Sequence, residues 1–272
     1  MSEAAQSVRL THHQVVSRID ALDRSTVSVG VLGTVFDYEI RALKVGRRSE
    51  GKKTILMTGG VHGDEPAGVE AVLTFLEGPV ETYLDDFFFC VIPCVNPSGL
   101  DLGTRENKAK QDVNRGMSDD DVPESVILRK FIEGRHFDVF FDHHEDYEAT
   151  GFYMYEAERE NHLLGEQIVE AVKAIGPIDG DENTDQGLDL PISEGLFGVN
   201  TKWRKQGWSA YAYFDHSSHV VLCETPSTAW DLDKRVRAHR IAQTITLDHY
   251  KGSRLHQGEA IWRWLRWLAS SR

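Results

Sequence analysis

The sequence contains no long hydrophobic run, and its apolar stretches fall well short of the ~18 residues that a membrane-spanning helix requires. The N-terminus, MSEAAQSVRLTHHQVV, has neither the basic start nor the apolar stretch of a secretory signal peptide. We therefore expect no membrane partner, and the cytoplasm is the expected location.

Cysteine is scarce, with three residues in the chain. Cys90 and Cys94 lie in the apolar run FFFCVIPCVNP, and Cys223 lies in another, HVVLCE. An odd number of cysteines in apolar runs is typical of buried, reduced thiols rather than of a disulfide framework. Their spacing within a strand is also a poor match for a zinc–thiolate site, in which cysteines are closely paired in a turn.

Basic residues are fewer than acidic ones: the chain has 30 Lys and Arg and 43 Asp and Glu, so its net charge is −13. A surface of that charge repels phosphate backbones, so we expect no nucleic-acid partner. Hydrophobic residues make up 40% and charged residues 27% of the chain, as in ordinary globular proteins. Length and composition together predict a single domain over residues 1–272.

Short apolar runs alternate with helical patterns through the middle of the chain. The runs lack polar alternation and therefore predict strands buried on both faces, at residues 54–60, 87–97, 137–146, 151–156 and 219–226. Terminal glycines, with proline at two of the starts, mark helices at residues 66–78, 123–134 and 161–176. This order predicts an α/β fold with a central mixed, mostly parallel β-sheet flanked by helices.

Both ends of the chain and one internal segment depart from this pattern. Residues 26–46 predict an antiparallel hairpin alternating around Gly33, within a β-rich N-terminal extension over residues 1–50. Residues 177–195 are acidic and punctuated by Gly and Pro, which favours a solvated surface loop over a lid. Residues 252–272 predict a Trp-rich terminal helix that docks on the body or on a second subunit, so a homo-oligomer stays open. A helix lying on a membrane surface is the less favoured alternative.

Reactive side chains gather where the apolar runs end. The runs finish in GGVHGDEP, VNPSG, FDHHED and CETPS. Open α/β sheets bind ligands at the carboxyl ends of their strands. We therefore expect five of these side chains to meet at that edge: His62, Glu65, Asn96, His144 and Glu224.

His62 and Glu65 predict a metal site. Two glycines end the preceding strand and Pro66 starts a helix at once, so two ligands three apart can chelate one ion in a tight turn. A nitrogen and a carboxylate together suit zinc. The same pair also occurs by chance, and a helix cap or a surface histidine is the alternative.

His144 is the third candidate ligand. Alternation along the strand points His144 to the face of Asp142 and points His143 away. Asp142 or Asp146 is the candidate carboxylate that orients the His144 imidazole, and the alternative is that neither does. For either histidine taken alone, a core residue bonded to the backbone is the alternative.

Glu224 is the candidate catalytic base. It follows the apolar run VVLC. Burying a carboxylate at the end of a strand costs free energy, so such a group is usually paired with another charge or has a functional role. Its natural role is to take a proton from water and pass it to a leaving amine. The segment 96–116 adds Arg105 and the pair Asn114–Arg115, and an arginine fork suits a carboxylate or a developing oxyanion. A solvated loop arginine is the alternative for each of them.

In their order along the chain, these motifs resemble those of the zinc carboxypeptidase superfamily, which includes the aspartoacylase and succinylglutamate desuccinylase branch. HGDEPAG is similar to its His-x-x-Glu metal turn, NPSG to its Asn-Pro-x-Gly turn and QDVNRG to its Asp-x-Asn-Arg stretch. FDHHED and LCETPS are similar to the strands that carry the third ligand and the catalytic glutamate. The resemblance covers residues 54–226 and implies one Zn²⁺ held by His62, Glu65 and His144.

The resemblance also implies roles for the arginine segment. Asn114 and Arg115 would grip a substrate carboxylate, and Arg105 would polarise the scissile carbonyl. Glu224 would act as base and then as acid. The expected function is a zinc-dependent, metallocarboxypeptidase-like hydrolase that cleaves an amide bond next to a free carboxylate in a small peptide.

Two other functions stay open. An N-acyl-amino-acid amidohydrolase, similar to aspartoacylase or succinylglutamate desuccinylase, would use the same residues. A non-catalytic carboxylate-binding module would keep the arginine clamp without turnover. The segment after Pro226 is too short for the extra C-terminal β domain of aspartoacylase-type enzymes, which favours the peptidase. The mobile tyrosine of many carboxypeptidases has no diagnostic motif, although Tyr211 and Tyr213 lie in the plausible region.

Overall fold

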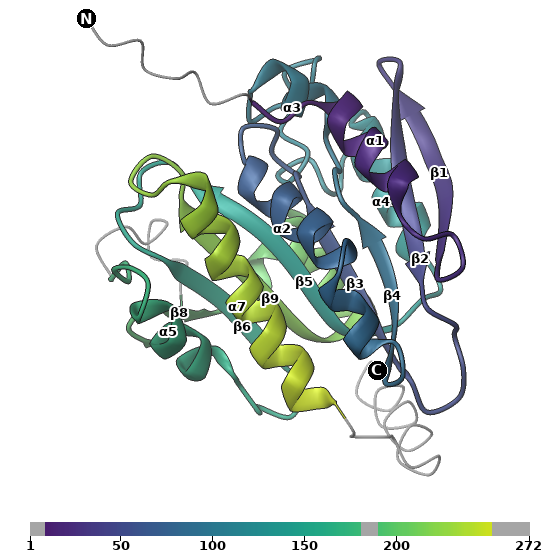
Figure 1. The fold of residues 1–272 in the computed structure, drawn as a ribbon. Helices are drawn as coiled ribbons and strands as arrows, with labels where there is room; N and C mark the ends of the chain where they lie inside the picture. The colour runs from purple at the N-terminus through teal and green to yellow at the C-terminus, as the bar shows by residue number, and fades with distance from the viewer. Residues whose placement is uncertain (1–8, 181–189, 252–272) are drawn as a thin grey trace, which may run out of the picture.

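A nine-stranded mixed β-sheet forms the centre of the computed structural model, which describes residues 9–180 and 190–251 (Figure 1). Its strand order is β1-β2-β4-β3-β5-β9-β6-β8-β7. The four strands β4, β3, β5 and β9 run parallel to one another, and the strands that flank them, β2 and β6, run antiparallel. The predicted α/β fold with a central mixed sheet is confirmed. The strands are β1 (Val27–Val35), β2 (Tyr38–Val45), β3 (Lys53–Gly59), β4 (Phe87–Ile92), β5 (Phe137–Asp146), β6 (Tyr153–Glu158), β7 (Leu190–Ser193), β8 (Leu196–Gly198) and β9 (Ser217–Pro226).

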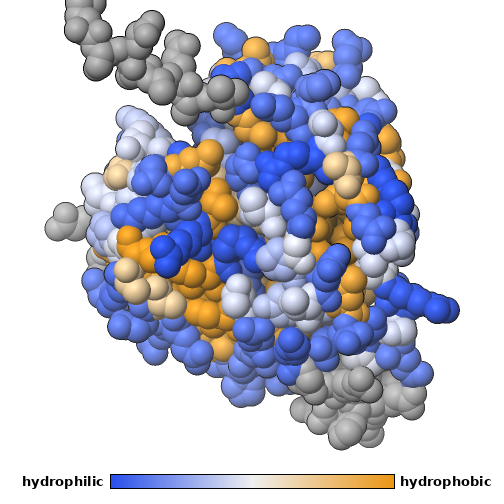
Figure 2. Space-filling view, viewed as in Figure 1, coloured by the Kyte–Doolittle hydropathy of each residue, from blue (hydrophilic) through white to orange (hydrophobic). Residues whose placement is uncertain are grey.

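Helices cover both faces of this sheet. One apolar core joins it to α1, α2, α5 and α7, and a second core joins the opposite face to α4 and α6. Figure 1 looks at the first of these faces, with α2 and α7 in front of the sheet, and Figure 2 shows hydrophilic side chains interleaved with apolar patches over the same face. The helices are α1 (His12–Ala21), α2 (Pro66–Leu76), α3 (Pro97–Leu102), α4 (Pro123–Ile132), α5 (Gly165–Lys173), α6 (Trp208–His216) and α7 (Leu232–Tyr250), with the short 3₁₀ helices η1 (Pro79–Tyr83) and η3 (Thr201–Lys205).

The predicted antiparallel hairpin is confirmed as β1 and β2. Its turn falls at Phe36 and Asp37, whose φ angles of 50° and 71° are those that a tight two-residue hairpin turn requires. Gly33 lies instead at a shift in the strand register. A Cβ at that position would lie 2.6 Å from Ile127 of α4, so the glycine lets the helix pack against the hairpin.

A helix that the sequence did not predict precedes this hairpin in the β-rich N-terminal region. Thr11 and Gln14 form a reciprocal capping box that starts α1. Val15 and Ile19 are buried one turn apart on its inner face. Local capping and a short apolar stripe are therefore enough to form the helix.

The segment expected to be a surface loop, residues 177–195, is also partly regular. Ile178 bridges to Phe152, and residues 190–193 form β7, which pairs with β8 at the edge of the sheet. Two of the β7 side chains, Leu190 and Ile192, are exposed, which fits an edge strand. Residues 181–189 lie outside the described part of the chain, so neither the loop nor the lid prediction is tested there.

The 19-residue helix α7 has no clear sequence signature. Its buried face carries polar His239, Gln243 and Thr246 among small and apolar side chains, so the usual hydrophobic period is weak. The Trp-rich helix predicted for residues 252–272 lies outside the described residues.

Two further sequence predictions can be compared with the structure. The three cysteines are free and buried, as predicted. Within residues 9–180 and 190–251, no helix has both the length and the apolar character that crossing a bilayer demands.

Candidate metal centre and active site

The carboxyl ends of three neighbouring parallel strands bring the candidate residues together. His62 and Glu65 lie in the turn after β3, and α2 begins immediately afterwards at Pro66. His144 of β5 and Glu224 of β9 are register partners on adjacent strands, so their side chains project from the same face of the sheet. The predicted convergence at the strand ends is thus observed.

Three of these side chains surround one point. A ligand atom from each of His62, Glu65 and His144 lies within 4.8 Å of the other two, and all three residues are buried. The Glu65 carboxylate lies between the imidazoles, with Oε1 2.5 Å from His62 Nδ1 and Oε2 2.9 Å from His144 Nδ1. Two nitrogens and a carboxylate oxygen therefore face a common centre.

A carboxylate lies behind each imidazole. Asp142 Oδ2 is 3.1 Å from His144 Nε2, as one of the two sequence alternatives predicted, and Thr58 Oγ1 donates to Asp142 Oδ1 at 2.7 Å. On the other side, Asp112 Oδ1 lies 3.3 Å from His62 Nε2, which makes no well-aligned hydrogen bond although it is buried. The Asp142 carboxylate therefore orients the His144 ring, and Asp112 lies close to the corresponding nitrogen of His62. The Nδ1 atom of each ring faces the common centre.

His143 projects to the opposite face of β5, as strand alternation predicts. Its Nδ1 is 2.6 Å from the Thr58 carbonyl oxygen, and its Nε2 is 2.8 Å from Gln243 of α7. Burial lowers the pKa of His143 to about 4, so this ring is neutral. His143 is therefore a core residue, and His144 is the histidine at the candidate centre.

The electrostatics of the cluster favour a positive charge at its centre. Burial raises the pKa of Glu65, but the adjacent His62 and His144 more than offset this and hold it well below its usual range. Burial lowers the pKa of His144, yet Asp142 and Glu65 raise it well above its usual value. A site in which buried carboxylates outweigh desolvation in this way is suited to a cation.

Glu224 lies beside this cluster in a different environment. Burial, reinforced by the charges of Glu65 and Asp146 and opposed by His144, raises the pKa of Glu224 to about 8. Its register partner on the other side is Tyr153 of β6, whose hydroxyl donates to Asp146 Oδ2 at 2.8 Å. A carboxyl group with a pKa near neutrality is suited to exchanging protons during catalysis.

Arg105 reaches the same cluster from the loop that follows α3. Its Nε donates to Asp112 Oδ2 at 2.9 Å, and its Nη1 lies 3.9 Å from Glu65 Oε1. The backbone carbonyl of Arg105 accepts hydrogen bonds from Asn96 Nδ2 at 3.3 Å and from the Gly63 N–H at 3.4 Å. The NPSG turn therefore places the Arg105 guanidinium next to the turn that carries His62 and Glu65.

Gly63 makes this arrangement sterically possible. A Cβ on Gly63 would lie 1.9 Å from the backbone carbon of Gly99, so any side chain would push the two turns apart. The HGDE and NPSG segments consequently form one backbone-to-backbone unit rather than two independent motifs.

Comparison with known proteins agrees with this geometry. Residues 51–178 match the succinylglutamate desuccinylase/aspartoacylase catalytic domain. A putative metallopeptidase from Shewanella amazonensis SB2B has a similar structure, with a TM-score of 0.74 at 21% identity over 88% of this chain and 92% of that chain. The family match covers residues 51–178, less than half of the chain, and the structural match shows a shared fold.

Two further proteins whose names refer to carboxypeptidases are similar to this chain. A metallo-carboxypeptidase from Pseudomonas aeruginosa, in complex with (2-guanidinoethylmercapto)succinic acid, matches with a TM-score of 0.61 at 19% identity, over 87% of this chain and 67% of that one. The inactive metallocarboxypeptidase ECM14 of Saccharomyces cerevisiae is 40% identical over 98 residues, which are 30% of this chain and 23% of that protein. The chain thus matches less than a quarter of the length of this curated relative, which is itself described as inactive.

The two residues expected to bind a substrate carboxylate follow Asp112 on the arginine segment. Asn114 is half-buried, and its Oδ1 accepts a hydrogen bond from the Trp208 N–H at 2.7 Å, where α6 begins. The Arg115 N–H donates to Asp112 Oδ1 at 3.0 Å, and the Arg115 side chain is exposed. The segment therefore has its backbone anchored at the site by Asp112, and Arg115 is exposed.

The tyrosines suggested by sequence position have other surroundings. Both lie on α6 and pack against the apolar core on that face. Tyr211 stacks on His216 with ring centroids 5.9 Å apart, and the guanidinium of Arg159 lies 5.4 Å from the centre of the Tyr213 ring. Tyr153 is instead the tyrosine beside Glu224, and only the pairing of β6 with β9 reveals it.

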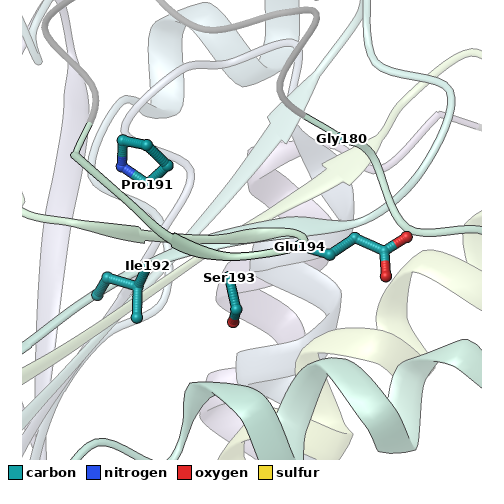
Figure 3. Close-up of a pocket in the computed structure, with 5 residues that line it drawn as sticks. All are labelled: Gly180, Pro191, Ile192, Ser193 and Glu194. Atoms are coloured by element: carbon teal, nitrogen blue, oxygen red, sulfur yellow. The ribbon is translucent and has the colours of Figure 1, made fainter.

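A surface pocket of about 280 Å³ lies away from the candidate centre (Figure 3). In Figure 3 the Glu194 carboxylate points away from the other labelled side chains, and it pairs with Lys173 Nζ at 2.8 Å. None of the lining residues belongs to the candidate centre, so the pocket has no role in the chemistry considered below. The residues that line it are Gly180, Pro191, Ile192, Ser193 and Glu194.

Proposed function

We propose that the protein is a zinc-dependent hydrolase of the metallocarboxypeptidase type, which cleaves an amide bond next to a free carboxylate. The observation that carries this proposal is the placement of Glu224 on the strand beside a buried cluster of His62, Glu65 and His144. The cluster offers metal ligands, and Glu224 offers a proton acceptor that is not needed to complete the ligand set.

The donor set fits zinc. Two imidazole nitrogens and one carboxylate oxygen form a three-ligand set that leaves a position for substrate or water, as in catalytic zinc sites. The buried His62 Nε2, without a well-aligned partner, faces Asp112, so small adjustments of the turn would give it an orienting carboxylate. When bound, zinc supplies a Lewis acid that polarises the amide carbonyl and makes water easier to deprotonate.

The remaining chemistry belongs to the side chains around the cluster. Glu224 takes a proton from the attacking water and gives it to the leaving nitrogen as the C–N bond breaks, so its charge is restored after each turnover. The Arg105 guanidinium, held by Asp112, pairs with the negative charge that develops on the carbonyl oxygen.

Asn114 and Arg115 are the proposed clamp for the substrate carboxylate. The Trp208 N–H fixes the Asn114 carbonyl oxygen, which orients the amide N–H₂ group as the donor end. The exposed Arg115 fork can pair with a carboxylate through two hydrogen bonds. Together they would select substrates with a free terminal acid.

The acidic surroundings of Glu224 favour a peptide over an anionic acyl group. Asp146 lies two residues beyond His144 on the same face of β5, and with Tyr153 it flanks the β6 side of the site. Asn114 and Arg115 lie on the same β3 side as Arg105, because Asp112 bonds to both arginines, so a substrate carboxylate held by this clamp would direct the acyl portion toward Asp146. A carboxylate at that end would repel a succinyl group and attract the ammonium of an unblocked peptide.

A substrate panel tests the proposed function. Turnover by the zinc-loaded protein is compared for an unblocked dipeptide, its N-acetyl and N-succinyl analogues, and its C-terminal amide. We expect the unblocked free acid to react fastest and the amide slowest. Preference for the N-succinyl compound would assign the protein to the acyl-amino-acid amidohydrolases, and binding of zinc and product without any turnover would assign it a non-catalytic role.

A further inference from the structure

Glu145, next to His144, is a buried carboxylate that the mechanism does not use. Strand alternation turns it to the face of the sheet covered by α2 and α7, away from the metal cluster. Its side chain is fully buried. Oε1 accepts a hydrogen bond from the Ala67 N–H at 2.6 Å, and Oε2 pairs with Arg235 of α7.

The hydrogen bond to Ala67 connects two ligand-bearing segments. Ala67 lies in the first turn of α2, two residues after Glu65, and the N–H groups of a first turn have no partner within their own helix. Glu145 supplies that partner, and its charge also suits the positive end of the helix. One carboxylate therefore ties the backbone beside His144 to the backbone beside Glu65.

The start of α2 lies directly against β5, so this connection is short and stiff. A Cβ on Gly68 would lie 2.7 Å from the His143 carbonyl oxygen, and only glycine permits such a close approach. With the helix in backbone contact with the strand, a small shift of its first turn would alter the distance between Glu65 and His144.

Arg235 holds the carboxylate from the other side. Its side chain is largely buried, and its Nε also donates to the Asp231 carbonyl oxygen at 3.4 Å at the start of α7. Glu145 is bonded to both α2 and α7. Helix α7 therefore supports the turn that carries His62 and Glu65, although α7 itself carries none of the three candidate ligands. Removing one member of a buried ion pair leaves the other charge without compensation.

We propose that Glu145 and Arg235 form a positioning pair that fixes the separation of Glu65 and His144 and thereby sets the affinity for the metal. This inference rests on the metal site of the proposed function. Glu145 and Arg235 are not metal ligands themselves. Their proposed role is to support metal binding, which is distinct from a general contribution to stability.

Glu156 of β6 provides a matched control. It too is fully buried, its oxygens accept the N–H groups of Leu164 and Gly165 at 2.8 and 2.7 Å where α5 begins, and it pairs with His219 at 2.7 Å. This carboxylate has the same chemistry as Glu145, but α5 carries no metal ligand. Its loss should affect folding without affecting the metal.

The experiment compares E145A with E156A in two measurements. The first is the thermal midpoint of the metal-free protein, and the second is the Zn²⁺ dissociation constant from competition with a chromogenic chelator. We expect both variants to lower the midpoint, and only E145A to weaken zinc binding, by about 10- to 100-fold, as is typical when a residue supporting a metal ligand is lost. E145Q keeps an oxygen for the Ala67 N–H but loses the ion pair, so it should fold if E145A does not and should show a smaller loss of zinc affinity.

Three outcomes separate the hypotheses. Wild-type zinc affinity in E145A and E145Q would overturn the positioning role and leave the pair purely structural. Equal weakening in E156A would also overturn it, because the effect would then follow general destabilisation. Failure of the unmodified protein to bind Zn²⁺ would instead remove the proposed function on which this inference rests.

Discussion

Replacing Glu224 with glutamine tests the chemistry separately from the metal site. The two side chains have the same shape, so E224Q preserves the packing between His144 and Tyr153 across the strands. Glutamine cannot accept the proton of water at neutral pH. The variant therefore removes the proposed base while leaving the three-residue cluster of His62, Glu65 and His144 complete.

The expected loss can be given a size. Removal of a general acid–base group costs about 10²- to 10⁴-fold in rate, which corresponds to about 2.7–5.4 kcal/mol in the activation free energy. The pKa of Glu224, raised to about 8 chiefly by burial, brings this group near the pH at which proton transfer in both directions is efficient. Because the same burial disfavours the charged carboxylate, we expect the neutral glutamine to leave the fold intact.

Two measurements on one preparation decide the outcome. The first is kcat on an unblocked dipeptide, and the second is zinc content by elemental analysis. We expect E224Q to retain zinc and to bind the product amino acid, with kcat reduced by at least about 100-fold. Near-normal turnover would refute the proposed mechanism, whereas joint loss of zinc and activity would make Glu224 a ligand or a structural residue.

Three other sets of substitutions give further tests. Alanine at any one of the three cluster residues should strip zinc, whereas His143→Ala should retain it; elemental analysis showing the reverse would reassign the third ligand. Arg115→Ala should weaken use of free-acid substrates by ~2–5 kcal/mol and of their amides much less, and equal losses in kcat/KM on both would make the residue structural. Gly63→Ala should lower the thermal midpoint and zinc affinity together, because the added Cβ meets Gly99; a variant unchanged in both would show that the two turns are not rigidly coupled.

The central sheet and the grouping of the candidate ligands could both be predicted from the sequence, for a common physical reason. Strands buried on both faces produce unbroken apolar runs, and parallel strands must end at a shared edge. His62, His144 and Glu224 follow such runs, so their convergence could be inferred from the chain alone. The choice of His144 over His143 follows likewise from the two-residue period of a strand.

The rest of the site depends on pairings that have no local signal. Tyr153 adjoins Glu224 because β6 pairs antiparallel with β9. The apolar sequences of these two strands do not indicate which strands will be neighbours in the sheet. Asp112 meets His62 across the fold, although it lies in the recognised QDVNRG segment. Helix α7 was not predicted because polar side chains occupy positions on its buried face that are usually apolar. Gln243 is buried there as a hydrogen-bonding partner of His143, and His239 is buried in ring contact with His143.

The polar inner face of α7 has a consequence for the order in which the molecule assembles. A helix with so weak an apolar stripe gains little from docking until the groups that face it are in place. Gln243 needs His143 on a formed β5, and Arg235 needs Glu145 at the end of that strand. We therefore expect the apolar sheet and α2 to form first, and α7 to dock late in folding, once the carboxyl end of β5 is in place.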